Sequence, residues 1–345
     1  MSIIVDIYTP ASYFGVKHDA DVITRTIKGA FKDHVKVRQI FVPLQYFQTG
    51  RLPESFFKTI EFVGDLALSI ERPYSADFFR LYKARALYIN PEWFNEADQA
   101  VCEDFDVLYL HKSSHYYSIL KEKFPKNRHV YTGFTSIDPS VSVNDYSTFT
   151  HFRGKSKRRL SQNLIDIWQQ NPSLPLLRLQ AYGNDVSINT NAWARADNIH
   201  FYFGKMERAQ YLREVAQGGI HLCTAQVEGF GHFINEARAM SALTIALDAP
   251  PMNELITKET GILVPAKALQ AQGFGMIYVA EQKDLVQAID HAQSLSIPER
   301  EQLGRNAREL YESQSASFRR SLVSYIQTVI DDISTGAAKP TTVKL

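Results

Sequence analysis

The chain has 345 residues, of which 45% are hydrophobic and 22% are charged, and its formal net charge is +1 at pH 7. This length allows two domains, and the composition is typical of a soluble globular protein. A net charge so close to zero gives no general affinity for nucleic acid. The sequence contains no run approaching the ~18 to 20 apolar residues of a membrane helix, and its first residues lack the basic start of a signal peptide. We therefore expect a cytoplasmic protein without a transmembrane segment.

Two cysteines, Cys102 and Cys223, lie far apart in the sequence, beside or within apolar segments. Buried thiols are expected at both positions, because a disulfide or a metal pair would need a partner cysteine nearby. No metal site follows from the cysteines.

The first half of the sequence alternates short apolar segments with amphipathic ones. We expect strands at residues 3–8, 35–42, 60–63, 66–70 and 86–89, and further strands with their exits within 106–115 and 130–138; helices are expected at 19–31, 76–84, 95–102 and 116–124. Such alternation predicts a doubly wound parallel sheet. No Gly-x-Gly-x-x-Gly motif follows the first strand, so a dinucleotide cofactor domain is not indicated.

Two places in this half carry polar residues directly after an expected strand. Pro91 ends one strand, so that Asn90 and Glu92 should be presented at the edge of the sheet that faces the cleft. A contact with substrate and a structural role stay equally open for these two residues. His111 and His115 lie in the polar turn after the next strand, where a solvated or hydrogen-bonded turn histidine is the ordinary explanation.

Residues 140–150 are mostly polar and separate two alternating regions, and we take them as a linker with a domain boundary near residue 150. Beyond it we expect strands within 151–156, 199–206, 219–224 and 243–247, and helices at 161–170, 208–217 and 233–240. After residue 265 we expect a less regular piece around 273–275, helices at 283–294 and 298–313, an amphipathic helix at 316–333 and a disordered tail from residue 336.

The segment 227–237 places two carboxylates, Glu228 and Glu236, eight positions apart around a glycine-flanked turn that opens a helix. Gly229 and Gly231 let a ligand approach the backbone closely, and the start of the helix favours a negatively charged group. Two hydrogen-bond acceptors beside an anion site suit a polyhydroxylated ligand that carries phosphate. On this segment alone, a capped turn with two solvated acids is an equal alternative.

A basic cluster at residues 155–159 lies on a loop between a strand and the start of a helix. A pyrophosphate would lie there, met by Lys155, Arg159 and backbone N–H groups, because open α/β sheets bind ligands at the carboxyl ends of their strands. Arg153 or Arg158 could share this role. The alternative is a solvated basic loop.

These motifs, read in order, resemble the donor domain of retaining GT-B glycosyltransferases, notably the large family 4. The Glu-x7-Glu spacing of Glu228 and Glu236 resembles the donor-binding signature of that family. The stretch 154–175 resembles its Gly-x-Ser-x-x-Lys-Gly-Thr…Trp…Pro opening, although Lys155 stands where the family usually has arginine and Arg159 where it has lysine. Residues 248–255 and 261–265 resemble the next loop and strand. The resemblance covers nearly all of the second half and the first half only loosely.

The resemblance implies an α/β GT-B fold, with two Rossmann-like doubly wound domains that face a central cleft. It implies an acceptor-binding domain at 1–150, a nucleotide-sugar donor domain at 151–315, a crossover helix at 316–334 that packs back on the first domain, and a disordered tail at 335–345.

The implied activity is that of a hexosyltransferase-type glycosyltransferase, which moves a sugar from a nucleoside diphosphate sugar to a hydroxyl of a glycan or other acceptor, with retention and with no metal or other cofactor. In such enzymes Glu228 would lie against the donor sugar, Glu236 would hold the ribose, and the backbone near Lys205 would hold the nucleobase. The implied catalytic residues are Glu228, Lys155 and Arg159; the implied donor-binding residues are Gly154, Gly204, Lys205, Met206, Glu228, Gly229, Phe230, Gly231, His232 and Glu236; the acceptor-side candidates are Gly15, Asn90, Glu92 and His111.

The expected partners are a nucleotide sugar and a glycan or glycolipid acceptor, and the acceptor could bring the protein to the inner face of a membrane. Nucleic acid is not expected, because the basic cluster is short and lacks interleaved aromatic residues. The two Asp-x-Asp pairs, at 19–21 and 104–106, lie outside the expected donor domain, so they do not indicate a metal on the donor phosphates. Two alternatives stay open: a sugar-nucleotide epimerase or hydrolase of the same fold, and a non-catalytic sugar-nucleotide or glycan-binding protein.

Overall fold

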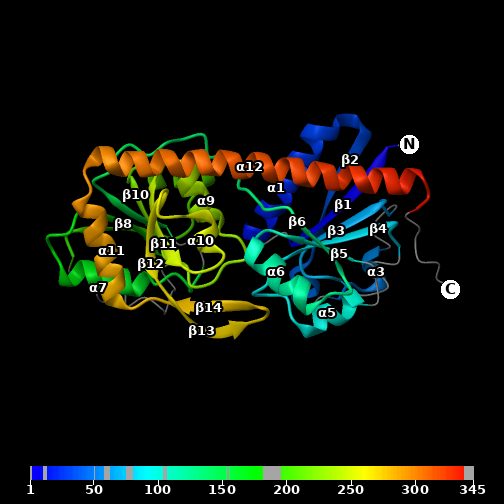
Figure 1. The fold of residues 1–345 in the computed structure, drawn as a ribbon, viewed down its shortest axis with the longest axis horizontal. Helices are drawn as coiled ribbons and strands as arrows, with labels where there is room; N and C mark the ends of the chain where they lie inside the picture. The colour runs from blue at the N-terminus through cyan, green and yellow to red at the C-terminus, as the bar shows by residue number, and fades with distance from the viewer. Residues whose placement is uncertain are drawn as a thin grey trace. The chain divides into compact units, whose positions relative to one another are not determined.

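The computed structural model describes residues 2–10, 14–49, 51–57, 63–74, 81–103, 107–152, 154, 156–181 and 196–337. The chain forms two compact units, each built on its own sheet (Figure 1). Unit 1 consists of Met1–Ser136, Ala271–Gly275 and Gln314–Leu345, and unit 2 consists of Ile137–Gln270 and Met276–Ser313. Neither unit is therefore one continuous stretch of sequence.

The sheet of unit 1 is parallel, with six strands in the order β2-β1-β3-β4-β5-β6. The strands are β1 (Ile3–Pro10), β2 (Val35–Val42), β3 (Leu66–Glu71), β4 (Ala84–Ile89), β5 (Leu108–His111) and β6 (Arg128–Tyr131). The helices are α1 (Phe14–Phe31), the 3-10 helix η1 (Lys32–His34), α2 (Leu44–Thr49), α3 (Glu54–Phe57), α5 (Glu96–Glu103) and α6 (Ser114–Lys123). Every residue of β3 is buried, as expected for a parallel strand covered on both faces.

The sheet of unit 2 is also parallel, with six strands in the order β12-β11-β10-β7-β8-β9. The strands are β7 (Phe149–Phe152), β8 (Leu177–Ala181), β9 (Ile199–Phe203), β10 (Ile220–Cys223), β11 (Leu243–Asp248) and β12 (Gly261–Pro265). The helices are α7 (Ser161–Gln170), α8 (Arg208–Val215), α9 (His232–Ala239), α10 (Met252–Leu255), α11 (Gln282–Ser294) and the first part of α12 (Ile297–Ser334).

Helix α12 corrects the expectation of two helices, one ending at residue 313 and one beginning at 316. It is a single helix of 38 residues, with no proline or glycine near residue 314 to interrupt it. Ser315, at the expected break, is buried, and its hydroxyl is hydrogen-bonded to the hydroxyl of Thr135. The segment from Gln314 onward belongs to unit 1, where Phe318 and Leu322 are fully buried.

The piece after residue 265 is a two-stranded hairpin, β13 (Lys267–Gln272) and β14 (Gly275–Val279), rather than an irregular segment. Gly273 has a φ of +57° in its turn, a conformation that favours glycine. The tip, residues 271–275, belongs to unit 1, where the ring of Phe274 packs against the rings of Phe94 and Phe124. The sequence did not predict this hairpin because the residues of β13 are mostly exposed on both faces. Such a strand shows no alternation of apolar and polar residues.

The polar stretch at 140–150 lies within unit 2, which begins at Ile137. The backbone N–H of Gly219 donates to the carbonyl of Asp145, and the hydroxyl of Tyr146 donates to the carbonyl of Ser241, each over 2.6 Å. These bonds hold the stretch against β10 and the end of α9, so its polar side chains reflect turns and caps in this unit.

Some expected elements fall outside the described residues. These include most of the strand at 60–63, most of the helix at 76–84 and the tail after residue 337. Cys102 and Cys223 are both buried and form no disulfide, which confirms the expectation for the thiols. Among the described residues, no helix is long and apolar enough to cross a membrane.

Candidate functional site

In unit 2, loops leave the carboxyl ends of neighbouring parallel strands along one edge of the sheet, the edge at which open α/β sheets bind ligands. Three of these loops contain a glycine with positive φ: Gly154 (+60°) after β7, Gly204 (+80°) after β9 and Gly231 (+100°) after β10. Gly231 is the N-cap of α9, and the left-handed conformation there favours a residue without a Cβ atom.

Arg159 and Glu228, both predicted as catalytic, lie together at this edge. Nη2 of Arg159 is 3.3 Å from Oε1 of Glu228, and the guanidinium carbon lies 3.4 Å from the ring centre of Phe233 in α9. Nε of Arg159 is buried and has no hydrogen-bond partner among the described residues. The Nε atoms of other arginines, Arg178 and Arg300 among them, also lack a partner in the described part of the chain, but that of Arg159 lies at this edge, where an acceptor on a ligand could satisfy it.

Backbone contacts fix the loop that carries Arg159. The hydroxyl of Thr224 donates to the carbonyl of Arg159 over 2.7 Å, and the N–H of Gln226 donates to the carbonyl of Arg158 over 2.9 Å. These bonds join the loop after β7 to the loop after β10. The loop that carries Arg159 and the loop that carries Glu228 therefore hold each other in place.

His151 holds the start of α7 in place. Its Nδ1 lies 2.7 Å from the carbonyl oxygen of Leu222 and donates to it, because a carbonyl can only accept. In the neutral ring Nε2 is then the acceptor, and it accepts from the hydroxyl of Ser161 over 2.8 Å. Ser161 is the first residue of α7, and the N-terminus of this helix lies beside the basic loop.

Glu236 is the fifth residue of α9 and is paired with Arg208, the first residue of α8. Oε1 of Glu236 accepts from Nη2 of Arg208 over 2.5 Å, and Oε2 lies 3.3 Å from Nη1. The side chain of Glu236 is 7% exposed and that of Arg208 is 35% exposed. The carboxylate predicted to hold a ribose is thus held by an arginine that the sequence analysis did not single out.

The remaining predicted donor residues surround these pairs. Gly229 and Phe230 are buried, and the ring of Phe230 meets that of His232 edge-on at 5.3 Å between ring centres. Lys205 is exposed and Met206 is half-buried. Lys155 and Arg153, in the basic loop, lie outside the described residues.

In unit 1, a buried chain of charged and polar groups lies at the carboxyl ends of the strands. Nζ of Lys112, after β5, donates to Oδ2 of Asp19 in α1 over 2.6 Å and to Oδ1 of Asn90, after β4, over 2.8 Å. Nδ2 of Asn90 donates to Oε2 of Glu71, the last residue of β3, over 2.9 Å. Both side chains of the Lys112–Asp19 pair are at most 3% exposed.

This buried network of side chains contains two carboxyl groups, those of Asp19 and Glu71, and one ammonium group, that of Lys112. Asp19 contacts Lys112 directly, whereas Glu71 reaches it only through Asn90. Burial therefore raises the pKa of Glu71 to about 7, against the smaller lowering effects of Asn90 and Lys112. Near neutral pH, Glu71 can hold or release a proton.

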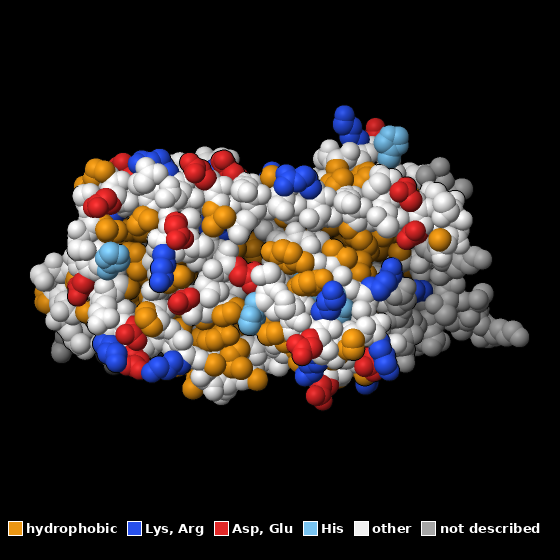
Figure 2. All heavy atoms as spheres, viewed as in Figure 1, with side chains coloured by type: hydrophobic (Ala, Val, Ile, Leu, Met, Phe, Trp, Pro, Cys, Tyr) orange, Lys and Arg blue, Asp and Glu red, His pale blue; other side chains and the backbone are white. Residues whose placement is uncertain are grey.

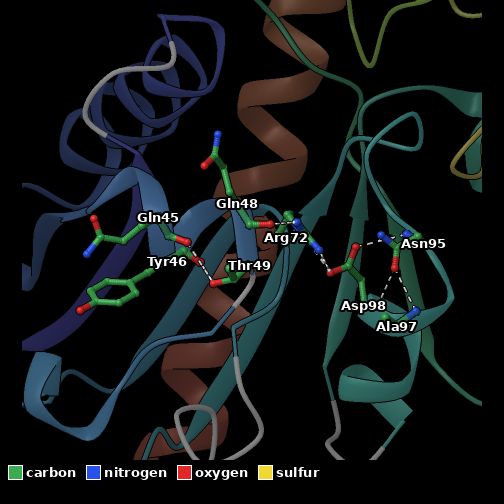
Figure 3. A network of polar contacts seen from close by, with 8 residues as sticks. All are labelled: Gln45, Tyr46, Gln48, Thr49, Arg72, Asn95, Ala97 and Asp98. Atoms are coloured by element: carbon green, nitrogen blue, oxygen red, sulfur yellow. Dashed lines mark hydrogen bonds and ion pairs between the residues drawn. The ribbon is translucent and has the colours of Figure 1, made fainter.

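Arg72, next to Glu71, is engaged elsewhere (Figure 3). Its Nη1 donates to the carbonyl of Gln48 over 2.5 Å, and its Nη2 donates to Oδ1 of Asp98 over 3.0 Å. Asp98 in turn forms a reciprocal cap with Asn95 at the start of α5. These contacts anchor the backbone at the end of β3, where Glu71 has a φ of +73°, an uncommon conformation for a residue with a Cβ atom.

His111, predicted as an acceptor-side residue, is buried at the end of β5. Its ring stacks on that of His129, and its Nε2 lies 2.9 Å from Nδ1 of His129, whose Nε2 donates to the carbonyl of Phe124. His129 Nδ1 is therefore the acceptor and His111 Nε2 the donor of the bond between the rings. Burial lowers the pKa of His111 to about 3, so the ring is neutral.

The other acceptor-side candidates are arranged differently. Gly15 is exposed in the first turn of α1, and open space surrounds the position of a Cβ atom there. Asn90 is buried in the charged chain described above, and Glu92 follows it in a half-buried turn. The backbone of Gly275 passes so close to Glu92 that an added Cβ would lie 3.0 Å from its Cα atom. The hairpin tip thus fixes the turn that contains Asn90 and Glu92.

The structure adds residues that the sequence analysis missed. Arg208 and Phe233 contact the predicted donor residues, and Asp19, Glu71 and Lys112 form the buried chain of unit 1. Glu71 and Lys112 each follow an expected strand directly, which is the signal that could have found them. Among the described residues, no group of three or more His, Cys, Asp or Glu side chains could hold a metal ion.

Several solved structures are similar in fold to this chain at low sequence identity. Sucrose-phosphate synthase from Thermosynechococcus elongatus is 14% identical over 97% of this chain and 100% of that chain, with a TM-score of 0.69. HepE from Anabaena in complex with UDP and glucose is 12% identical over 96% of this chain and 100% of that chain, with a TM-score of 0.64. The pneumococcal O-GlcNAc transferase GtfA in complex with UDP and GlcNAc is 17% identical over 80% of this chain, with a TM-score of 0.59, and this chain spans 59% of its length.

The chain has the GT-B fold of these proteins, with two Rossmann-like α/β domains. The fold expected from the sequence is thereby confirmed. No protein-family model matches the sequence, and no curated protein matches it. The resemblance to family 4 in particular stays a prediction.

Proposed function

We propose that the protein is a glycosyltransferase, which moves a sugar from a nucleoside diphosphate sugar to a hydroxyl group of a glycan or other acceptor. The observation that carries this proposal is the pairing of Arg159 with Glu228 and of Arg208 with Glu236 at the ligand-binding edge of the unit 2 sheet. The GT-B fold supports it, since HepE and GtfA contain UDP together with a sugar in their solved complexes. A uridine nucleotide is therefore the first donor to test.

The donor diphosphate would lie against Arg159, whose orphaned Nε could donate to a phosphate oxygen. Transfer forms a bond between the acceptor oxygen and the anomeric carbon and breaks the bond from that carbon to the diphosphate. The electron pair leaves with the diphosphate, which takes up the proton of the hydroxyl group. Arg159, together with Lys155, would stabilise the charge that develops on the leaving group.

The two glutamates would have separate tasks. Glu236 would accept hydrogen bonds from the ribose hydroxyls, while Arg208 keeps its carboxylate oriented. Glu228 would lie against the transferred sugar, where its pairing with Arg159 sets its direction. Retention of the anomeric configuration and catalysis without a metal ion belong to this proposal on the strength of the family resemblance.

A panel of nucleotides and nucleotide sugars, measured by thermal stabilisation of the protein, tests the proposal. We expect UDP or another nucleoside diphosphate to raise the melting temperature, because a ligand that binds the folded state stabilises it. The Glu236→Ala variant should lose most of the shift. If no nucleotide in the panel shifts the melting temperature of the wild-type protein, the proposal is wrong.

Turnover of the donor separates the alternatives. A transferase forms a glycosidic product only when an acceptor is added, whereas a hydrolase or epimerase consumes the donor without one. A protein that binds the nucleotide sugar but never consumes it, with any acceptor in a glycan panel, would be a non-catalytic binding protein.

A further inference from the structure

Trp93, in the turn after β4, has an aromatic side chain on the surface of unit 1. It is 56% exposed, whereas Trp168 is fully buried. Figure 2 shows hydrophobic side chains at many places on the visible face of the molecule, so exposure alone does not mark a binding site. Trp93 differs from an ordinary exposed residue in the backbone that carries it and in the groups around it.

Hydrogen bonds fix the backbone of this turn. Within the turn, the N–H groups of Trp93 and Phe94 donate to the carbonyl of Asn90 over 3.0 and 3.1 Å. From the hairpin tip, the N–H of Phe274 donates to the carbonyls of Pro91 and Phe94 over 2.8 and 3.1 Å. The indole is therefore an exposed ring on a backbone that is held in place. A ligand that binds such a ring pays little for ordering it.

The neighbouring rings are covered, but the indole of Trp93 is open. Phe94 is fully buried and packs against the rings of Phe274 and Phe124. Nζ of Lys123 lies 4.4 Å from the centre of the Phe274 ring. Among the described residues, no aromatic ring, cation or hydrogen bond contacts the indole of Trp93. Trp93 thus offers an apolar ring face together with an N–H donor.

The turn lies at the carboxyl end of β4, the edge at which open α/β sheets bind their ligands, and it carries negative charge. Residues 90–97 include two carboxylates, Glu92 and Glu96, and no basic residue. Lys112, which donates to Asn90, is buried and paired with Asp19. A phosphate or another anion would therefore be repelled here, whereas carboxylate oxygens accept hydrogen bonds from hydroxyl groups.

We propose that the indole of Trp93 is the platform on which a sugar ring of the acceptor stacks. The acceptor is then a neutral saccharide or glycoside rather than a phosphorylated compound or a simple alcohol. One face of a pyranose ring presents several C–H groups, which are apolar and slightly positive, and the face of an aromatic ring is negative. The platform serves the acceptor side of the proposed glycosyltransferase reaction, so it rests on that function. A membrane would need a wider apolar surface than one ring between Glu92 and the buried Phe94.

Calorimetry on the full chain, with UDP present at saturation to occupy any donor site, tests the proposal. The probes are the neutral disaccharides cellobiose, lactose, maltose and chitobiose, with glucose 6-phosphate as the anionic comparison. We expect at least one disaccharide to bind saturably and at least ~10-fold more tightly than glucose 6-phosphate, because the carboxylates of the turn repel a phosphate.

Three variants locate the site. Trp93→Ala should weaken the binding of that disaccharide by at least ~10-fold, because the apolar ring face is lost. Trp93→Phe keeps an aromatic face and should bind within about 3-fold of the wild type. Leu81→Ala is the control, since Leu81 is 47% exposed before the opposite end of β4, and it should change binding by less than about 2-fold. Circular dichroism checks that the variants fold.

Four outcomes would overturn the inference. They are a lack of saturable binding of every disaccharide, equal effects of Trp93→Ala and Leu81→Ala, glucose 6-phosphate binding as tightly as the disaccharides, and recruitment to phosphatidylcholine vesicles that Trp93→Ala abolishes. The last result would assign the indole to a membrane surface.

The melting temperature of the same preparations with UDP distinguishes a failure of the platform from a failure of the proposed function. If UDP raises it and no disaccharide binds, the platform is wrong while the donor site stands. If a disaccharide binds through Trp93 and no nucleotide has any effect, the platform stands and the transferase function is wrong.

Discussion

Arg208 donates to Glu236 over 2.5 Å, from the first residue of α8 to the middle of α9. The two residues are 28 positions apart: Arg208 lies in the helix after β9, and Glu236 lies in the helix after β10. A carboxylate so nearly buried would be costly without this partner. The pair therefore makes Arg208 a positioning residue for the carboxylate that we assign to the ribose.

The first prediction concerns the coupling of these two residues. Glu236→Ala should weaken the binding of the preferred nucleoside diphosphate by ~1 to 3 kcal/mol, because ribose hydroxyls would lose their acceptor. Arg208→Ala should also weaken it, but should have no further effect in the Glu236→Ala background. Calorimetry on the two single variants and the double variant measures this, with the exposed Arg213→Ala of the same helix as control. Additive effects would show that Arg208 acts independently of Glu236.

Arg159 should stabilise the leaving diphosphate. Arg159→Ala should lower turnover at saturating donor by ~30- to 1,000-fold, which corresponds to ~2 to 4 kcal/mol of transition-state stabilisation. Its exposed neighbour supplies the control, since Arg158→Ala keeps the loop and removes an equal charge. Equal rate losses in the two variants would mean that only the net charge of the loop matters.

Glu228 should matter for transfer rather than for nucleotide binding. If its carboxylate lies against the transferred sugar, Glu228→Ala should leave the affinity for the bare nucleoside diphosphate within about 2-fold and depress transfer severely. Calorimetry and a transfer assay on the same preparation measure the two effects. A loss of nucleotide affinity as large as that of Glu236→Ala would contradict separate tasks for the glutamates.

Glu71 should make the stability of the protein depend on pH. Its pKa is raised from 4.5 to about 7 in the folded protein, so between these values the folded state holds a proton that the unfolded state has released. Stability from this group is fully present below pH 4.5 and is lost as the pH rises towards 7, by at most ~3 kcal/mol. Glu71→Gln should therefore unfold at higher denaturant concentration than the wild type at pH 8 and show a smaller difference at pH 5.

Denaturant titrations at several pH values measure this effect. Glu309→Gln, an exposed position on α12, is the control and should leave the pH dependence unchanged. If the stability of the wild type changes between pH 5 and pH 8 by the same amount as that of Glu71→Gln, then the pKa of Glu71 lies in its ordinary range.

Catalysis should survive the removal of divalent metal ions. The predicted phosphate site contains Arg159 and Lys155, whose positive charges can take the place of a metal ion on the diphosphate. Turnover should be unchanged in EDTA, and added magnesium or manganese should not raise it. Complete inhibition by EDTA that a metal ion reverses would refute this part of the proposal.

Local patterns predicted much of the fold. The helix at 161–170 was expected at its observed bounds, because Leu164, Ile167 and Trp168 recur at helical spacing and are buried in the structure. Strands β3 and β11 lie within one residue of their expected bounds, since burial on both faces leaves continuous apolar runs. Strands β6 and β7 each begin two residues earlier than expected. The continuity of α12 was not predicted, because residues 313–315 are polar and interrupt the apolar pattern, although none of them is a helix breaker.

Long-range pairing could not be predicted from one sequence. Lys112 and Asp19 are 93 positions apart, and nothing in their local sequences reveals that both are buried. The same holds for Arg208, which reads as an ordinary exposed start of a helix until α9 is placed beside it. The sequence predicted the site residues that are glycines or charged residues following a strand. It did not predict the residues that contact them from other elements.

The division of the chain has a consequence for its synthesis. All six strands of unit 1 leave the ribosome before residue 132, yet the unit also needs residues 271–275 and the segment from Gln314 onward, where Phe318 and Leu322 are buried. Unit 2 needs nothing after Ser313. The sheet that is translated first must therefore wait with part of its apolar surface uncovered while the second unit is completed, the reverse of the usual order in which nascent domains fold.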